Sequence, residues 1–330
     1  LKPFEARWAR AVSPLNIPLA LPISAMPFAS LNGATLWYDD WGPAEAEPLI
    51  FHHGYTGYRR SVGYFEGGAA WLLSHDLAPG AYRCIFVEAR GCNDSRDAPG
   101  PYSIAQQALD VLTLADMLEL HTFSFCGHSM GGGVGWQLLA SHSDRIRRMV
   151  LLAPVPARGF PKSPGEMEGP RQHVLQHFGW LPKYTSEAAA LERQRVVSEG
   201  RRGDTEEYLQ DRARMLVSVP EEYWTEAWLS MRNLSLEAAL PSISTPVLVI
   251  AGASDELLRA NVEDSLRLGD GVLHVLSGAG HEVARDDPLG VARAMHGFFT
   301  GEALSPSAKR ALVERRLRER GHGSVPDSKL

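Results

Sequence analysis

The segment CGHSMGG, residues 126–132, places one serine, Ser129, two positions after Gly127 and two positions before Gly131. The apolar run TFSFC at 122–126 precedes it and predicts a strand, and a helical pattern follows it. A sharp turn from a strand into a helix lifts a serine hydroxyl above the edge of a sheet. Glycines on both sides remove side chains that would clash in so tight a turn. The pattern therefore predicts Ser129 as a nucleophile rather than as a small residue in a turn.

Seven short apolar runs end in turn residues and predict strands. They are ATLWYDDWG (34–42), PLIFHHG (48–54), YRCIFVEARG (82–91), TFSFCGHS (122–129), IRRMVLLAP (146–154), TPVLVIAGASD (245–255) and GVLHVLSGAGH (271–281). Helical patterns lie between many of them, and the clearest, at 103–120, repeats its apolar residues at spacings of three and four. This alternation predicts an α/β fold with a mainly parallel sheet that is covered by helices on both faces.

The alternation stops between about residues 155 and 240, where the sequence is helical in character and rich in large residues. We expect an inserted helical cap over 155–240 and a core made of 31–154 and 241–300. The tryptophans Trp180, Trp224 and Trp228 are candidates for the substrate pocket, although packing of a cap onto a core is the commoner role of such side chains.

Composition excludes several classes of function. The chain has 330 residues, 44% of them hydrophobic and 22% charged, which is ordinary for a globular protein with a large core. The net charge of −6 gives no indication of nucleic-acid binding. No apolar run is long enough to span a membrane. The three cysteines, Cys84, Cys92 and Cys126, are odd in number and lack metal-type spacing, so we predict free thiols in a reducing compartment, with no metal site and no cofactor.

A serine hydroxyl is a weak nucleophile and needs a base. In the chain order serine, acid, histidine, the base lies near the C-terminus. His281 fits, because it lies in a loop of small residues after the last predicted strand and before the last predicted helix. Four other histidines lie in or beside strands and are predicted to be structural: His52, His53, His128 and His274.

The third member of a triad holds the imidazole in the correct tautomer. Asp255 ends the run TPVLVIAGASD and precedes His281 by 281 − 255 = 26 residues. Glu256 is the adjacent competitor, and an aspartate at this place can also be a helix N-cap. We predict Asp255, because the capping role would leave His281 without a partner.

Acyl transfer also needs amide donors for an oxyanion. The residue after the nucleophile, Met130, and the loop HHGYTG at 52–57 are expected to supply them. We predict the backbone N–H groups of Met130 and Tyr55 as the oxyanion hole. His53 and Tyr55 join the tryptophans as candidate pocket residues.

The chain resembles the α/β-hydrolase fold superfamily. The matching pieces are His53-Gly54-Tyr55, EARGCNDS at 88–95, GHSMGG at 127–132, AGASDELL at 251–258 and GAGHEVARDDP at 278–288. In relatives the second piece reads Asp-x-Arg-Gly-x-Gly, whereas this chain has Glu88 and Asn93, two positions expected to be structural. The resemblance implies a Ser–Asp–His triad. A serine at 129 disfavours the dehalogenases and epoxide hydrolases of this fold, which use aspartate there.

These observations together predict a serine hydrolase that cleaves a small carboxylic ester, lactone or thioester through an acyl-enzyme. The sequence leaves three alternatives open: a carbon–carbon bond hydrolase, an acyltransferase of secondary metabolism, and a ligand-sensing protein on a hydrolase scaffold. It does not identify the acyl substrate.

Residues 1–30 are expected to be a disordered, dispensable extension. A weak signal peptide, a weak mitochondrial signal and a start at Met26 are the alternatives considered. A charged tail over 301–330 ends in Ser328-Lys329-Leu330, which matches a peroxisomal import signal. We therefore expect an import receptor as a partner and a peroxisomal location in a eukaryotic source, with the cytoplasm as the alternative.

Deleting Ser328-Lys329-Leu330 should move the protein from peroxisomes to the cytosol and leave its activity in vitro unchanged, because import receptors read the free terminus. Fluorescence imaging of an N-terminally tagged protein measures this. A tagged full-length chain that stays in the cytosol would show that the tripeptide is a coincidence.

Overall fold

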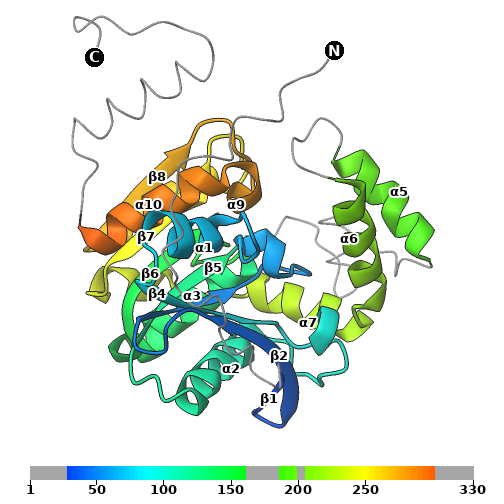
Figure 1. Ribbon diagram of the computed structural model, residues 1–330, viewed down its shortest axis with the longest axis horizontal. Coiled ribbons are helices and arrows are strands. Elements are labelled where there is room, and N and C mark those ends of the chain that lie inside the picture. Colours follow the sequence, from blue (N-terminus) through cyan, green and yellow to red (C-terminus); the bar gives the residue numbers. More distant parts are fainter. Residues whose placement is uncertain (1–27, 161–185, 199–204, 302–330) are drawn as a thin grey trace, which may run out of the picture.

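A computed structural model of the chain describes residues 28–160, 186–198 and 205–301. Its centre is one sheet with the strand order β1-β2-β4-β3-β5-β6-β7-β8 (Figure 1). β1 and β2 pair antiparallel, as do β2 and β4, and all remaining pairs are parallel. The strands are β1 Phe28–Leu31, β2 Ala34–Trp41, β3 Glu47–His52, β4 Tyr82–Val87, β5 Phe123–His128, β6 Ile146–Leu152, β7 Val247–Gly252 and β8 Gly271–Leu276.

Helices connect the parallel strands. The α-helices of the described residues are α1 Ala69–Trp71, α2 Ile104–Met117, α3 Met130–His142, α5 Glu187–Val197, α6 Glu206–Ser218, α7 Glu221–Arg232, α8 Leu258–Arg267, α9 Val283–Asp286 and α10 Pro288–Thr300. Short turns of 3-10 or π helix are η1 Arg59–Val62, η2 Leu72–Leu77, η3 Asn93–Ser95, η4 Ser143–Arg145 and η5 Glu237–Ser242.

The predicted α/β fold with a mainly parallel sheet is confirmed. Each of the seven predicted runs overlaps one of the strands β2 to β8, the pattern at 103–120 contains α2, and the helices predicted after Ser129 and after His281 correspond to α3 and α10. β1 was not among the strands predicted from the sequence. This strand has only four residues, in which buried and exposed positions alternate, and it depends on antiparallel pairing with β2 rather than on an apolar run of its own.

Two hydrophobic clusters cover the two faces of the sheet. Side chains alternate between the faces along each strand, so Ile50 and Phe125 belong to one cluster, while Phe51 and Cys126 belong to the other. The first cluster includes the buried sides of α2 and α3, and the second includes those of α1 and α10. Because helices cover both faces of the sheet, the strands β3, β5 and β7 are buried along nearly their whole length.

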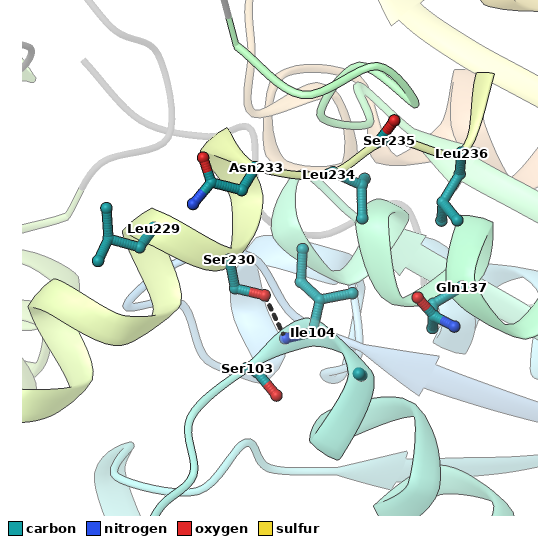
Figure 2. A pocket seen from close by; sticks show the side chains of 10 residues that line it. Ser103, Ile104, Gln137, Leu229, Ser230, Asn233, Leu234, Ser235 and Leu236 are labelled. Atoms are coloured by element: carbon teal, nitrogen blue, oxygen red, sulfur yellow. Dashed lines mark hydrogen bonds between the residues drawn. The ribbon is translucent and has the colours of Figure 1, made fainter.

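Helices α5, α6 and α7 all lie in the chain between β6 and β7 and form a group beside the sheet, drawn in green to yellow-green in Figure 1. α7 is fixed to the N-terminus of α2, as the close-up in Figure 2 shows: the N–H of Ile104 donates to Ser230 Oγ at 2.8 Å. The N–H of Tyr102 donates to Glu226 Oε2 at 3.0 Å. Residues 1–27, 161–185, which include Trp180, 199–204 and 302–330 lie outside the described residues; the last three residues of the predicted extension, 28–30, belong to β1.

A buried ion pair joins α2 to the loops that follow β1 and β4. Arg90 Nε lies 2.6 Å from Asp110 Oδ2, and the two side chains are 2% and 4% exposed. The guanidinium also donates to the backbone oxygens of Leu31, Asn32 and Pro99. Burying a charge is costly unless it is paired and hydrogen-bonded, and here every side of the guanidinium has an acceptor.

Glu88 lies in the loop after β4, and its carboxylate holds that loop together by hydrogen bonds. Its buried carboxylate accepts from the side chain of Asn93 at 2.9 Å and from the backbone N–H groups of Asp94 and Ser95. Burial raises the pKa of Glu88 to about 7. Glu88 and Asn93 are the two positions that depart from the motif Asp-x-Arg-Gly-x-Gly. They bond to each other, so the departure is a matched change within one loop.

The three cysteines are buried free thiols. Burial raises the pKa values of Cys84 and Cys92 to about 12, so neither forms a thiolate at neutral pH.

Among the helices that the structure describes, none has the length and apolar character needed to cross a bilayer.

Asp110→Ala should lower the free energy of unfolding by about 3–5 kcal/mol, because removal of one partner leaves the buried Arg90 charge uncompensated. Urea denaturation of the purified variant measures this loss.

Asp116→Ala is the matched control on the same helix. Asp116 pairs with Arg145 at 2.6 Å, but its side chain is 64% exposed, and exposed pairs contribute no more than about 1 kcal/mol. Equal losses in the two variants would contradict the importance assigned to the buried pair.

Candidate active site

Ser129 lies in the turn between β5 and α3, with φ +52° and ψ −110°. The turn brings backbones so close together that side chains are excluded. A Cβ atom at Gly127 would lie 2.2 Å from the carbonyl oxygen of Gly131, and one at Gly131 would lie 2.5 Å from that of His52. Glycine is therefore required at both positions, because any side chain there would collide with a backbone oxygen. The two glycines let the first turn of α3 pack against the ends of β3 and β5.

The side chain of Ser129 meets that of His281, which follows β8. His281 Nε2 lies 2.9 Å from Ser129 Oγ. His281 Nδ1 lies 3.0 Å from Oδ2 of Asp255, which follows β7. The structure thus brings together the three predicted residues from the carboxyl ends of three strands. Glu256, the competing acid, lines the same cavity, but it is Asp255 whose carboxylate bonds the ring.

The environment of the pair sets the charge of each member. Burial acts to raise the pKa of Asp255, but the hydrogen bond and charge of His281 and the N–H of Leu257 outweigh it and lower the pKa below its usual value. For His281, burial acts to lower the pKa. The hydrogen bond and charge of Asp255, with further contributions from Glu282 and Glu256, outweigh burial and raise it. An ionised Asp255 therefore faces an imidazole with increased affinity for a proton.

Three other histidines near the turn are buried and favour the neutral form. Burial lowers the pKa of His52 to about 4, and it also lowers those of His53 and His128. His53 accepts the N–H of Ala89 at Nε2, which leaves Nδ1 to donate to the Gly54 carbonyl at 2.8 Å. His128 Nε2 lies 3.0 Å from the His281 carbonyl oxygen. Their contacts are those of structural residues that hold the surrounding loops.

The loop after β3 passes directly beside Ser129. A Cβ atom at Gly54 would lie 3.0 Å from the Cβ of Ser129, and the N–H of Gly57 closes a turn onto the Gly54 carbonyl at 2.8 Å. Tyr55 lies within this turn and lines the cavity. Met130 is the first residue of α3, where backbone N–H groups have no partner within the helix. The two predicted amide donors thus belong to the two segments that flank the serine.

A cavity of about 620 Å³ opens over Ser129. Its floor is formed by the loops after β3, β5, β7 and β8, and its wall includes side chains of α6 and α7. Its lining includes Tyr55, Thr56, Ser129, Tyr208, Arg212, Trp228, Glu256, His281 and Glu282. A cavity of this size accommodates a small organic molecule.

The predicted pocket residues divide into three groups. Tyr55 and Trp228 line the cavity. His53 and Trp224 do not: His53 is fully buried beneath the loop, and Trp224 lies behind Tyr55, with its ring edge-on at 5.4 Å. Trp180 is outside the described residues.

Two charged residues of the cavity, Arg212 and Glu282, were not predicted from the sequence. Arg212 is on α6, whose apolar periodicity identifies the core-facing side but not a half-buried arginine at its edge. Glu282 directly follows His281, and this adjacency was the one available signal. Within the described ranges, no three His, Cys, Asp or Glu side chains cluster in a way that could hold a metal ion.

Comparison with known proteins agrees with this architecture. Residues 47–288 match the model of the family described as alpha/beta hydrolase fold. The chain is 25% identical over 239 residues to a non-heme chloroperoxidase of Streptomyces lividans, a match that covers 69% of this chain and 81% of the relative. It is 28% identical over 243 residues to 3-oxoadipate enol-lactonase 2 of Acinetobacter baylyi, with 72% and 81% covered.

Solved structures share the fold. The enol-lactonase from Burkholderia xenovorans LB400 superposes with a TM-score of 0.62 at 24% identity, which covers 83% of this chain and all of the other. An esterase from Thermogutta terrifontis gives a TM-score of 0.64 at 21% identity, with 83% and 97% covered. The strand order, the serine turn and the family match lead to one conclusion: this chain belongs to the α/β-hydrolase fold family.

Proposed function

We propose that the protein is a serine hydrolase of small carboxylic esters, lactones or thioesters, with Ser129, His281 and Asp255 as its triad. The observation that carries the proposal is the continuous chain of hydrogen bonds from Ser129 Oγ through His281 to Asp255. A chain of this kind, opening on a cavity, is the arrangement that activates a serine for attack on a carbonyl carbon. The enol-lactonase relatives and the esterase neighbour support this class of reaction.

The reaction follows from the geometry in two stages. Ser129 Oγ attacks the carbonyl carbon while its proton passes to His281 Nε2, and the N–H groups of Tyr55 and Met130 bind the oxyanion. The tetrahedral intermediate collapses, His281 protonates the leaving oxygen or sulfur, and an acyl-Ser129 ester remains. A water molecule then gives a proton to His281 and attacks the ester, and the acid is released as Ser129 regains its proton.

The charges of the site suit these roles. Asp255 remains ionised and stabilises the imidazolium that forms when His281 takes the serine proton. The raised pKa of His281 makes it a stronger base for the same reason. An intact and correctly bonded triad favours an enzyme over a ligand sensor, since binding alone needs no proton relay.

Ser129→Ala should abolish turnover of p-nitrophenyl esters, with a loss of roughly 10⁶-fold, as seen when a triad nucleophile is removed. Labelling by a fluorophosphonate probe should disappear as well. The turn should persist, because alanine is smaller than the serine it replaces.

The control is Ser124→Ala, which removes a serine from β5, the strand that precedes the turn. Ser124 bonds Glu47 at 3.0 Å, away from the cavity. This variant should keep both labelling and turnover. Comparable turnover in wild type and Ser129→Ala would remove Ser129 from the mechanism.

Glu282→Gln should move the acidic limb of the pH profile of kcat/KM to lower pH. The base acts in its neutral form, so the limb follows the pKa of His281. Glu282 raises that pKa, and the pKa of Glu282 itself lies at about 2, because the charges of neighbours that include Arg285 and Arg212 outweigh the effect of burial. Removing the charge therefore lowers the pKa of His281.

Glu256→Gln provides a graded comparison, because Glu256 contributes less to the same pKa. The acidic limb of the pH profile of kcat/KM for Glu256→Gln should also move to lower pH, by a smaller amount than for Glu282→Gln. A shift to higher pH in either variant would contradict the assignment of His281 as the base.

A further inference from the structure

The loop that carries Tyr55 contains a backbone conformation that needs support. Thr56 has φ +48°, a region that is unfavourable for a β-branched residue. Such conformations persist only where the surrounding structure determines them. Tyr55, whose backbone amide is proposed to bind the oxyanion, directly precedes Thr56. Contacts that hold Thr56 therefore also fix the position of that amide.

The support comes from two helices that lie far away in sequence. Both backbone polar groups of Thr56 bond to side chains of α6 and α7. Its carbonyl oxygen accepts from Arg212 Nη1, and its N–H donates to the hydroxyl of Tyr223 at 3.3 Å. The neighbouring hydroxyl of Tyr55 donates to the carbonyl oxygen of Trp224 at 2.5 Å.

Tyr223 reaches both segments of the proposed oxyanion hole. Its hydroxyl accepts from the Thr56 N–H and donates to Met130 Sδ at 3.9 Å. Its ring stacks on that of Tyr55, with 5.8 Å between centroids and 14° between planes. The side chain is fully buried and is not part of the cavity lining, so it does not meet the substrate.

The helix that carries Tyr223 is itself anchored to the core. Ser230 and Glu226 of α7 accept the N–H groups of Ile104 and Tyr102 at the start of α2 (Figure 2 shows the first of these bonds). The position of the Tyr223 hydroxyl is therefore fixed relative to the sheet. Hydrogen bonds thus connect the start of α2, through α7, to the loop after β3.

We propose that Tyr223 is a positioning residue that sets the geometry of the oxyanion hole, so that α7 completes the catalytic site rather than only covering it. This inference rests on the proposed function for its catalytic consequence. The physical part, that Tyr223 holds the loop at residues 54–57, is independent of any activity. Arg212 supports the same loop but also lines the cavity, so Tyr223 gives the cleaner test.

Tyr223→Phe removes the hydroxyl and keeps the ring. With a p-nitrophenyl ester, kcat should fall roughly tenfold, less than the about 10²–10³-fold loss that follows removal of an oxyanion donor itself. KM should stay unchanged, because no substrate contact is lost. The rate of fluorophosphonate labelling should fall in the same proportion as kcat, since the phosphoryl oxygen occupies the oxyanion hole.

Tyr102→Phe is the matched control. Tyr102 is also buried and packs edge-on against Tyr223 at 5.6 Å, but its hydroxyl bonds Ala98 and not the loop. Its kcat and KM should equal those of wild type. Equal losses of kcat in the two variants would overturn the proposal, because they would indicate a general packing effect.

The rate of amide hydrogen exchange measures how firmly the loop at residues 54–57 is held, and it needs no catalytic turnover. Peptides that cover residues 54–57 should exchange several-fold faster in Tyr223→Phe than in wild type or Tyr102→Phe. Unchanged exchange would overturn the proposal, and so would faster exchange with unchanged kcat. If wild type neither cleaves esters nor takes the label, the proposed function fails, while faster exchange in Tyr223→Phe alone still supports the positioning of the loop by α7.

Discussion

The close approach of β5 to the first turn of α3 is the constraint on which the rest of the site depends. A side chain at Gly127 or Gly131 would collide with backbone oxygens, so the turn can form only with glycine at both positions. Once formed, it holds Ser129 at φ +52° with its hydroxyl at the carboxyl edge of the sheet. In parallel sheets the loops at that edge come from several strands, and this is where open α/β folds bind ligands. The loops after β7 and β8 therefore need only short excursions to bring Asp255 and His281 to the serine.

Electrostatics within the site separate one histidine from its neighbours. His52, His53 and His128 are buried without a carboxylate bonded to the ring, and desolvation keeps them neutral. His281 is surrounded by Asp255, Glu256 and Glu282, and these charges reverse the effect of burial on its pKa. The same type of side chain is therefore a rigid structural element in one place and a strong base in another, and the difference lies in the acidic groups around it.

The helices between β6 and β7 have two roles in this arrangement. Tyr208 and Arg212 of α6 and Trp228 of α7 line the cavity and limit its volume. Tyr223, on the other side of α7, bonds the loop after β3 instead. The segment that shapes the cavity is thus connected by hydrogen bonds to the loop proposed to bind the oxyanion, and part-buried hydrogen bonds connect α7 in turn to the start of α2.

The sequence by itself determined the α/β architecture and the three residues that meet at the cavity. Strands buried on both faces appear as continuous apolar runs, and the glycines around Ser129 mark a turn that few sequences tolerate, so local patterns carried this information. Its place directly after an apolar strand also favoured Asp255 over Glu256, although only the tertiary structure shows which carboxylate bonds His281. The four-residue strand β1, the charged cavity residues Arg212 and Glu282, and the exclusion of His53 and Trp224 from the cavity were decided by the tertiary structure. These features depend on contacts between segments far apart in the chain, such as Tyr223 with Thr56, for which neither hydrophobic periodicity nor a short motif leaves a signal.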